Sequence, residues 1–308
     1  MQIYQHWQGL DGKAKGASVA MGNFDGVHLG HRSVIDLART GAPLGIVSFE
    51  PHPRDYFAPG SPPFRLMNSE ARANRLAKLG VEVLYELPFG PDLASLTPEE
   101  FARDVLCLGL GVSHVVVGAD FCFGKGRAGK AADLQALGKK HNFAVTIADL
   151  VKSDGQEISS TAIRQALTDG HPRIAAAMLG HWHRIDGEVI HGEKRGRELG
   201  YPTANMSVSG LHLPRFGVYA VYADVLTGQH QGRYMGAASL GVRPMFGVNQ
   251  PNLETFLFDF NGDLYGQHLS IAFVDYLRPE LTFNGLQDLL DQMDADCSLA
   301  RDILTAQP

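Results

Sequence analysis

Short apolar runs alternate with amphipathic stretches through the first half of the chain. The runs are bounded by glycine or polar residues, which is typical of strands buried on both faces. The alternation favours a parallel sheet with flanking helices, built from right-handed β-α-β units. We expect strands at 17–21, 44–49, 81–85, 114–118 and 143–148. We expect helices at 31–39, 69–79, 98–108, 131–141, 159–169 and 172–179.

The pattern changes after Gly180, where apolar and polar positions begin to alternate. From about residue 184 to 276 the period is two and glycines are frequent, as in an antiparallel barrel or sandwich. The pair Asn261-Gly262 predicts a hairpin turn. We expect strands at 216–225, 254–260 and 269–275. The chain therefore divides into an α/β domain over 1–180 and a β-barrel domain with a terminal helix over 184–308.

The last segment predicts one long amphipathic helix. Apolar residues recur there in steps of three or four, at Leu286, Leu289, Leu290, Met293, Cys297, Ala300 and Leu304. We expect the aspartates between them to form the solvated face: Asp288, Asp291, Asp294, Asp296 and Asp302.

Composition narrows the class of protein. Of the 308 residues 44% are hydrophobic and 19% charged, which supports packed cores. No apolar run is long enough to span a membrane, and the N-terminus does not resemble a secretory signal. The three cysteines are scattered, which favours the reducing cytoplasm. The net charge of -6 leaves neither half basic, so we expect small-molecule partners and neither nucleic acid nor membrane.

A glycine-rich turn with two histidines follows the first strand, in Met21-Gly-Asn-Phe-Asp-Gly-Val-His28-Leu-Gly-His31. Its glycines permit a sharp turn, and the helix that opens near His31 offers backbone N–H groups to phosphate. His28 and His31 could donate hydrogen bonds to phosphate oxygens that gain charge. The alternative interpretation is a pair of surface or capping histidines.

Three further segments of the first half carry polar side chains near the ends of expected strands or helices. Ser159, Ser160 and Thr161 are helix-capping types, and Arg164 lies one turn later, a combination suited to a triphosphate. His52 sits between two prolines, where a stiff loop is the alternative interpretation. The loop with Asp120, Lys125 and Arg127 could equally be a flexible basic loop.

The second half has one dense polar segment, from Gly187 to Asn205. Thr203 and Asn205 lie two apart in extended chain, so their oxygens point the same way and suit magnesium. A barrel hairpin with a basic turn is the alternative. The basic loop that could wrap phosphates contains Gly192, Lys194, Gly196, Arg197, Gly200 and Pro202.

The motif from Gly22 to His31 resembles the HxGH nucleotidylyltransferases. It is most similar to the adenylyltransferase half of prokaryotic bifunctional riboflavin kinase/FAD synthetases, a Rossmann-like domain. Similar motifs continue at Phe49-Glu-Pro-His52-Pro, Val117-Gly-Ala-Asp120 and Ser160-Thr161-Ala-Ile-Arg164. The resemblance implies that the histidines and the Ser-Thr-x-x-Arg element contact ATP phosphates. It assigns these residues to ATP or FMN: Gly22, Asn23, Phe24, Asp25, His52, Asp120, Lys125, Arg127, Ser160, Thr161 and Arg164.

The second half resembles the riboflavin kinase domain of the same family through Pro202-Thr203-Ala-Asn205. The resemblance implies that Thr203 and Asn205 hold Mg²⁺ with ATP, that Glu254 is the general base, and that Arg278 contacts flavin. Strand alternation alone would make Glu254 a solvent-facing residue. The implied substrates and products are ATP, riboflavin, FMN and FAD.

The chain departs from the family pattern at three positions. Cys122 stands where Arg is frequent, Arg72 where Lys is usual, and Met245 where Thr is common. None of these replaces a proposed catalytic group. Two other functions stay open at this point: a nucleotidylyltransferase for another phosphorylated substrate with a binding barrel, and a flavin- or nucleic-acid-binding regulatory protein.

Overall fold

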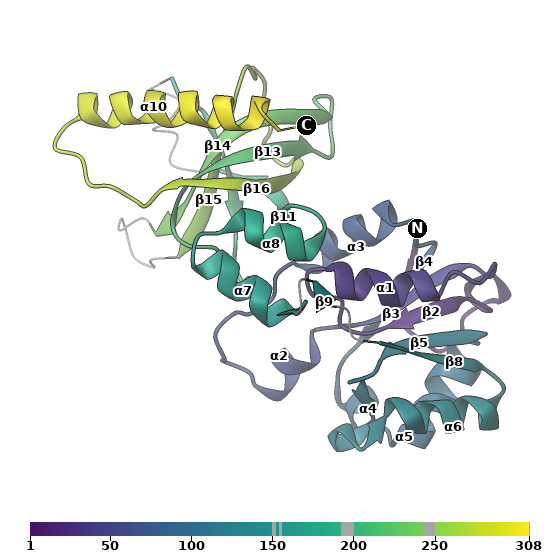
Figure 1. The fold of residues 1–308 in the computed structure, drawn as a ribbon. Helices are drawn as coiled ribbons and strands as arrows, with labels where there is room; N and C mark the ends of the chain where they lie inside the picture. Colours follow the sequence, from purple (N-terminus) through teal and green to yellow (C-terminus); the bar gives the residue numbers. More distant parts are fainter. Residues whose placement is uncertain (150–151, 154–155, 192–199, 243–249, 308) are drawn as a thin grey trace. The chain divides into compact units, whose positions relative to one another are not determined.

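The computed structural model describes residues 1–149, 152–153, 156–191, 200–242 and 250–307. The chain forms two compact units, whose elements are labelled in Figure 1. The first unit comprises residues 1–62 and 72–158, and the second comprises residues 63–71 and 159–308. The helices expected at 159–169 and 172–179, α7 (Ser160–Thr168) and α8 (Pro172–Leu179), belong to the second unit.

A six-stranded parallel sheet in the order β1-β4-β3-β2-β5-β8 forms the centre of the first unit. Its strands are β1 (Gln2–Tyr4), β2 (Ser18–Met21), β3 (Leu44–Glu50), β4 (Val83–Pro88), β5 (His114–Gly118) and β8 (Ala144–Ala148). The last five confirm the predicted strands. β1 escapes prediction because its three residues form no apolar run and lie at the sheet edge. Val19, Val47 and Val115, one from each of three neighbouring strands, are fully buried in the core.

The helices of this unit largely follow the expected pattern. They are α1 (Leu29–Leu37), α2 (Pro53–Phe57), α3 (Ser69–Lys78), α4 (Pro91–Ala94), α5 (Pro98–Glu100) and α6 (Ala131–His141), of which α3 begins with three residues of the second unit. The helix expected at 98–108 is wrong in type beyond its first turn, because α5 continues as a π-helix, η2 (Phe101–Gly109). Short elements are η1 (Gly12–Ala14), β6 (Cys122–Phe123), η3 (Lys125–Arg127), β7 (Gly129–Lys130), β9 (Lys152–Ser153) and β10 (Gln156–Glu157).

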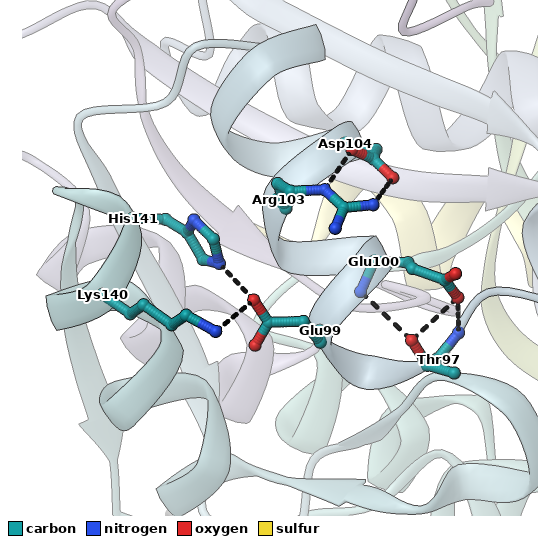
Figure 2. Close-up of polar contacts among 7 residues, drawn as sticks. All are labelled: Thr97, Glu99, Glu100, Arg103, Asp104, Lys140 and His141. Atoms are coloured by element: carbon teal, nitrogen blue, oxygen red, sulfur yellow. Dashed lines mark hydrogen bonds and ion pairs between the residues drawn. The ribbon is translucent and has the colours of Figure 1, made fainter.

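The start of α5 shows why the chain turns helical there (Figure 2). Thr97 Oγ1 accepts from the Glu100 N–H at 3.2 Å, and Glu100 Oε2 accepts from the Thr97 N–H at 2.8 Å, which completes a capping box. Glu99 accepts hydrogen bonds from Lys140 at 2.7 Å and His141 at 2.8 Å. These two donors lower the pKa of Glu99 and tie α5 to the end of α6.

A closed antiparallel barrel in the order β11-β12-β15-β14-β13-β16 forms the centre of the second unit. Its strands are β11 (His183–Ile190), β12 (Thr203–Ser207), β13 (Gly217–Val225), β14 (Gly232–Val242), β15 (Pro251–Leu257) and β16 (His268–Arg278). The hairpin predicted at Asn261-Gly262 is wrong, because β15 and β16 are not neighbours in the barrel. Asp259, with φ 55°, takes the left-handed conformation in this connection instead.

The C-terminal helix α10 (Leu286–Thr305) packs on the outside of the barrel, as Figure 1 shows. Ala300 and Leu304 are buried against Ala220 and Ala237 of the barrel wall, which confirms the predicted apolar face. Two expectations for this helix are wrong. Leu286 is 56% exposed because it lies in the first turn, and Asp296 is only 6% exposed because it pairs with an arginine of the barrel.

Candidate active sites

The turn that follows β2 is strained at non-glycine positions. Phe24 has φ 52° and Val27 has φ 43°, although both side chains are buried. A branched residue such as Val27 rarely adopts this conformation, so the surrounding structure must hold it there. Such strain is typical of functional sites. The turn contains Gly22, Asn23 and the buried Asp25, and it leads into the N-terminus of α1.

His28 is the N-cap of α1, so the helix begins at Leu29 rather than near His31 as expected. Its Nδ1 atom accepts a hydrogen bond from the His31 backbone N–H at 3.2 Å. An imidazole nitrogen that accepts cannot carry the proton, so the ring proton of His28 lies on Nε2. The His28 side chain can therefore cap the helix through Nδ1 and also donate a hydrogen bond from Nε2.

The rings of His28 and His31 stack with their centroids 3.7 Å apart and their planes at 16°. The buried Phe24 ring packs on His31 from 5.2 Å. Burial, followed by the charge of His28, lowers the pKa of His31 well below its usual value. Its Nδ1 atom is buried and has no hydrogen-bond partner among the residues that the structure describes. The two rings are thus held against each other, the low pKa of His31 keeps its ring neutral at pH 7, and each ring can offer an N–H group.

Three segments with predicted site residues meet at one edge of the sheet. β2 lies between β3 and β5, all three are parallel, and the chain order reverses at β2. Gly22, His52 and Asp120 therefore follow the carboxyl ends of adjacent strands. In open α/β sheets this edge, at the point where the order reverses, is where ligands bind.

The outer residues of this edge differ in exposure. His52 is half-buried and caps α2, since its Nδ1 atom accepts from the Arg54 N–H at 3.0 Å. Asp120, Lys125 and Arg127 are exposed, and the latter two lie in the short turn η3. The turn is held close to α5, because a side chain at Gly124 would come within 2.8 Å of Pro98.

Ser160, Thr161 and Arg164 lie on α7 in the second unit. The N-cap of α7 is Ser159, whose Oγ accepts from the Ala162 N–H at 3.3 Å. Arg164 donates from Nε to the Phe64 carbonyl at 2.5 Å, and its guanidinium lies 5.5 Å from the centre of the Phe64 ring. The guanidinium is therefore fixed within its own unit.

Polar side chains gather on the outer face of the barrel, across β12 and β15. Asn205 stands directly opposite Glu254 in the antiparallel register. Thr203 and Asn205 lie on the same face of β12, and the Asn205 Nδ2 atom donates to the Thr203 carbonyl at 3.2 Å. Glu254 is buried and accepts from Asn252 Nδ2 at 3.0 Å. The predicted metal ligands and the predicted base are thus brought together by strand pairing.

The structure describes only some of the other residues that were predicted for the kinase site. Gly192, Lys194, Gly196, Arg197 and the departure Met245 lie outside the described residues. Of the same segment, Gly200 has φ 85° and Pro202 is exposed just before β12.

Arg278 makes a forked ion pair rather than facing solvent. Its Nε atom donates to both Asp296 carboxylate oxygens, and its Nη2 atom donates to Asp296 Oδ2 at 2.6 Å. Nη1 donates to the Pro279 carbonyl at 3.0 Å. The predicted flavin contact of Arg278 stays a prediction, while its structural contact ties the end of β16 to α10.

Sequence reasoning missed the contacts of two residues, Asn252 and Arg72. Asn252 precedes Glu254 by two residues, so strand alternation could have placed both on one face. Arg72, noted only as a departure, is 3% exposed and donates to Glu50 at 3.0 Å and Glu86 at 2.7 Å. Through Glu50, the last residue of β3, Arg72 thereby restrains the chain two residues before His52.

Two kinds of feature are absent from the described part of the chain. No group of three or more His, Cys, Asp or Glu residues lies arranged to hold a metal ion in that part. None of the helices there is long and apolar enough to cross a membrane.

The comparisons with known proteins cover both halves. The sequence model of the FAD synthetase family matches residues 11–162, and that of the riboflavin kinase family matches residues 179–304. A bifunctional riboflavin kinase/FMN adenylyltransferase of Pseudomonas fluorescens is 39% identical, over 98% of this chain and 97% of its own. The same-named protein of Escherichia coli (strain K12) is 37% identical, over 95% of this chain and 92% of its own.

A solved structure is similar over nearly the whole chain. The crystal structure of a protein named as a macrolide-efflux protein from Streptococcus pneumoniae has a TM-score of 0.81 and 31% identity, and the match covers 97% of this chain and 98% of that one. Both kinds of comparison thus match nearly the whole length of this chain. The chain belongs to the family of bifunctional riboflavin kinase/FMN adenylyltransferases.

Proposed function

We propose that the two reactions of this family take place at the two sets of residues described above. As a member of the family, the chain is a riboflavin kinase and an FMN adenylyltransferase. The first activity phosphorylates riboflavin with ATP, and the second joins FMN to AMP from another ATP, releasing pyrophosphate. We assign the second activity to residues 1–180 and the first to residues 184–308. Apart from Ser160, Thr161 and Arg164, which lie in the second unit, the residues assigned to adenylyl transfer lie in the first unit and those assigned to the kinase lie in the second, and this separation supports the assignment.

For the adenylyl transfer we propose a mechanism of positioning and charge stabilisation. A phosphate oxygen of FMN attacks the α-phosphorus of ATP, the new phosphoanhydride bond forms, and pyrophosphate leaves. The FMN phosphate is already a nucleophile, so no covalent enzyme intermediate is required. His28 offers the N–H of Nε2, because its Nδ1 atom is engaged with the start of α1. Stacking on His28 holds the His31 ring in place for a second donation.

The other residues of the strand edge complete this proposed site. The backbone of 22–25 and His52 and Asp120 follow adjacent strand ends and would contact ATP or FMN. Lys125 and Arg127 would supply positive charge from an exposed turn. The family resemblance also assigns Ser160, Thr161 and Arg164 to the ATP phosphates, and we retain that role as a prediction.

For the kinase we propose Glu254 as the general base. Its carboxylate takes the proton of the ribityl 5'-hydroxyl as that oxygen attacks the γ-phosphorus of ATP, and ADP leaves. Glu254 is buried and accepts a hydrogen bond from the Asn252 amide, and both features restrain its position. Arg278 and the basic segment 192–202 are proposed to contact riboflavin and ATP.

The donor set on β12 fits a magnesium ion carried by ATP. Thr203 supplies a hydroxyl oxygen and Asn205 an amide oxygen, two hard ligands on one strand face. Magnesium keeps several positions for water and phosphate, so two protein oxygens suffice. When bound there, the ion would neutralise charge on the β- and γ-phosphates. We propose that the reactions use free small molecules in the cytoplasm, which agrees with three free cysteines.

A time course with purified protein tests the proposed function. Riboflavin and Mg–ATP are supplied, and flavins are separated by chromatography. We expect FMN to appear first and FAD to follow, and we expect chelation of Mg²⁺ to stop FMN formation. Absence of FMN in the presence of Mg–ATP would contradict the proposal.

A further inference from the structure

Asn252 connects the proposed base of the kinase to a proposed metal ligand. Its Nδ2 atom donates to Glu254 Oε1 at 3.0 Å and makes a longer contact of 3.4 Å with Asn205 Oδ1. The Asn205 Nδ2 atom donates in turn to the carbonyl of Thr203 at 3.2 Å and to its hydroxyl at 3.4 Å. One continuous chain of hydrogen bonds therefore runs from the carboxylate to both metal ligands.

The residues paired with Asn252 on the two neighbouring strands are small. Asn252 is paired with Ser207 on β12 and with Gly241 on β14, two small residues. Asn205 is the diagonal neighbour on β12, and Glu254 is the next residue on the same face of β15. Neither paired residue itself carries a large side chain, and the Glu280 carboxylate lies in the space that a side chain at Gly241 would fill.

The direction of the hydrogen bonds fixes the orientation of each amide. An ionised carboxylate only accepts hydrogen bonds, so Asn252 must turn its NH₂ group toward Glu254. The same NH₂ group then meets Asn205, which must present Oδ1 to it. A carbonyl oxygen has two lone pairs, so Oδ1 can accept from Asn252 and still bind a cation. Without this donor, rotation of Asn205 would present its NH₂ group to the metal.

We propose that Asn252 is a positioning residue of the kinase site, which couples the orientation of the Asn205 metal-binding oxygen to the Glu254 carboxylate. This inference rests on the proposed roles of Thr203, Asn205 and Glu254. Few side chains could replace the amide. A hydroxyl has one proton and cannot donate to both acceptors, and a lysine would place a positive charge beside the metal.

Two substitutions remove the donor in different ways. Asn252→Leu keeps a similar volume without polar atoms, and Asn252→Asp keeps the shape but offers only acceptors. The control Asn261→Asp adds the same charge at an exposed position of the connection between β15 and β16. Three quantities are measured on the full chain: kcat for FMN formation, the Kd of ADP by calorimetry with Mg²⁺ and with EDTA, and FAD formation from supplied FMN.

We expect both Asn252 variants to lower kcat for FMN formation by about 10- to 100-fold, as for other residues that orient metal ligands. The Kd of ADP should rise about tenfold with Mg²⁺ and stay unchanged in EDTA, because the lost interaction acts through the metal ligand. FAD formation from FMN, and all properties of Asn261→Asp, should match the wild type.

Contrary results fall into separate classes. Wild-type protein that forms no FMN would overturn the proposed function itself. Wild-type activity together with unchanged kcat and Mg²⁺-dependent ADP binding in both Asn252 variants would overturn this inference alone. A lower midpoint of thermal unfolding with normal kcat and Kd would assign Asn252 a structural role and would also overturn it.

Discussion

The imidazole rings of His28 and His31 stack 3.7 Å apart, and His28 Nδ1 accepts the backbone N–H of His31. His28 therefore stabilises the start of α1 and also belongs to the proposed adenylyltransferase site. A substitution of His28 changes both properties unless the replacement keeps the cap. Asparagine is among the best N-cap residues, whereas alanine is a poor one.

We predict that His28→Ala and His28→Asn both abolish FAD formation from FMN, because neither offers the imidazole N–H. Only His28→Ala should lose stability, by about 1 kcal/mol, since it removes the helix cap. Urea unfolding and flavin chromatography measure the two effects. FAD formation by His28→Asn at the wild-type rate would show that capping is the only role of His28.

ATP binding near His31 should take up a proton. Burial and the neighbouring His28 lower the pKa of His31, so its ring is neutral at pH 7 before ATP binds. A triphosphate close to the ring favours the charged form and raises that pKa. Calorimetry in two buffers of different ionisation enthalpy measures the uptake, with His31→Gln as the control. Equal uptake by wild type and His31→Gln would place the triphosphate away from this ring.

Acid should destabilise the barrel through His183. Burial, with smaller effects of His181 and His212, lowers the pKa of His183 to about 3. Its Nε2 atom has no partner in the described part of the chain, and its ring lies 5.7 Å from Phe273. The unfolded chain binds a proton below its ordinary pKa of about 6.5, so the free energy of unfolding falls by about 1.4 kcal/mol per pH unit between these values.

The fluorescence of Trp182, next to His183, reports this unfolding when Trp7 is replaced by phenylalanine. Urea curves between pH 7 and pH 5 give the free energy of unfolding at each pH. His183→Phe keeps an aromatic ring but cannot titrate, so we expect it to flatten the dependence. An unchanged slope in that variant would assign the acid sensitivity to other groups.

The forked pair of Arg278 and Asp296 should contribute strongly to the attachment of α10. Asp296 is 6% exposed, and removal of one partner leaves the other charge without compensation. We predict that Asp296→Asn lowers the free energy of unfolding by about 3 kcal/mol. Asp302→Asn, at an exposed position of the same helix, should change it by less than about 0.5 kcal/mol. Equal effects of both substitutions in urea unfolding would contradict this account.

The sequence predicts the parallel sheet well because each buried strand is a local apolar run. Prediction from the sequence fails where a strand or side chain contacts a partner that is distant in the chain. Asn261-Gly262 has the composition of a hairpin, but β15 pairs with β12 and β14 through contacts that no local pattern records. Asp296 lies between apolar positions like the other aspartates of α10, yet Arg278 draws it into the interior.

The candidate sites also contain some residues that a local motif reveals and others that only strand pairing brings together. His28 and His31 are recognisable because they lie only three positions apart in the chain. Glu254 and Asn205 lie 49 positions apart, and only the register of β12 with β15 sets them opposite each other. Asn252 carries no motif of its own, so its contact with both residues became visible only with that register.

One reaction is assigned to residues 1–180 and the other to residues 184–308, and a pair of substitutions tests this assignment directly. His28→Asn and Glu254→Gln are each supplied with riboflavin and Mg–ATP, and separately with FMN and Mg–ATP, while flavins are separated over time. We predict that His28→Asn accumulates FMN without FAD, and that Glu254→Gln forms FAD from FMN but no FMN from riboflavin. Loss of both reactions in either folded variant would contradict the account.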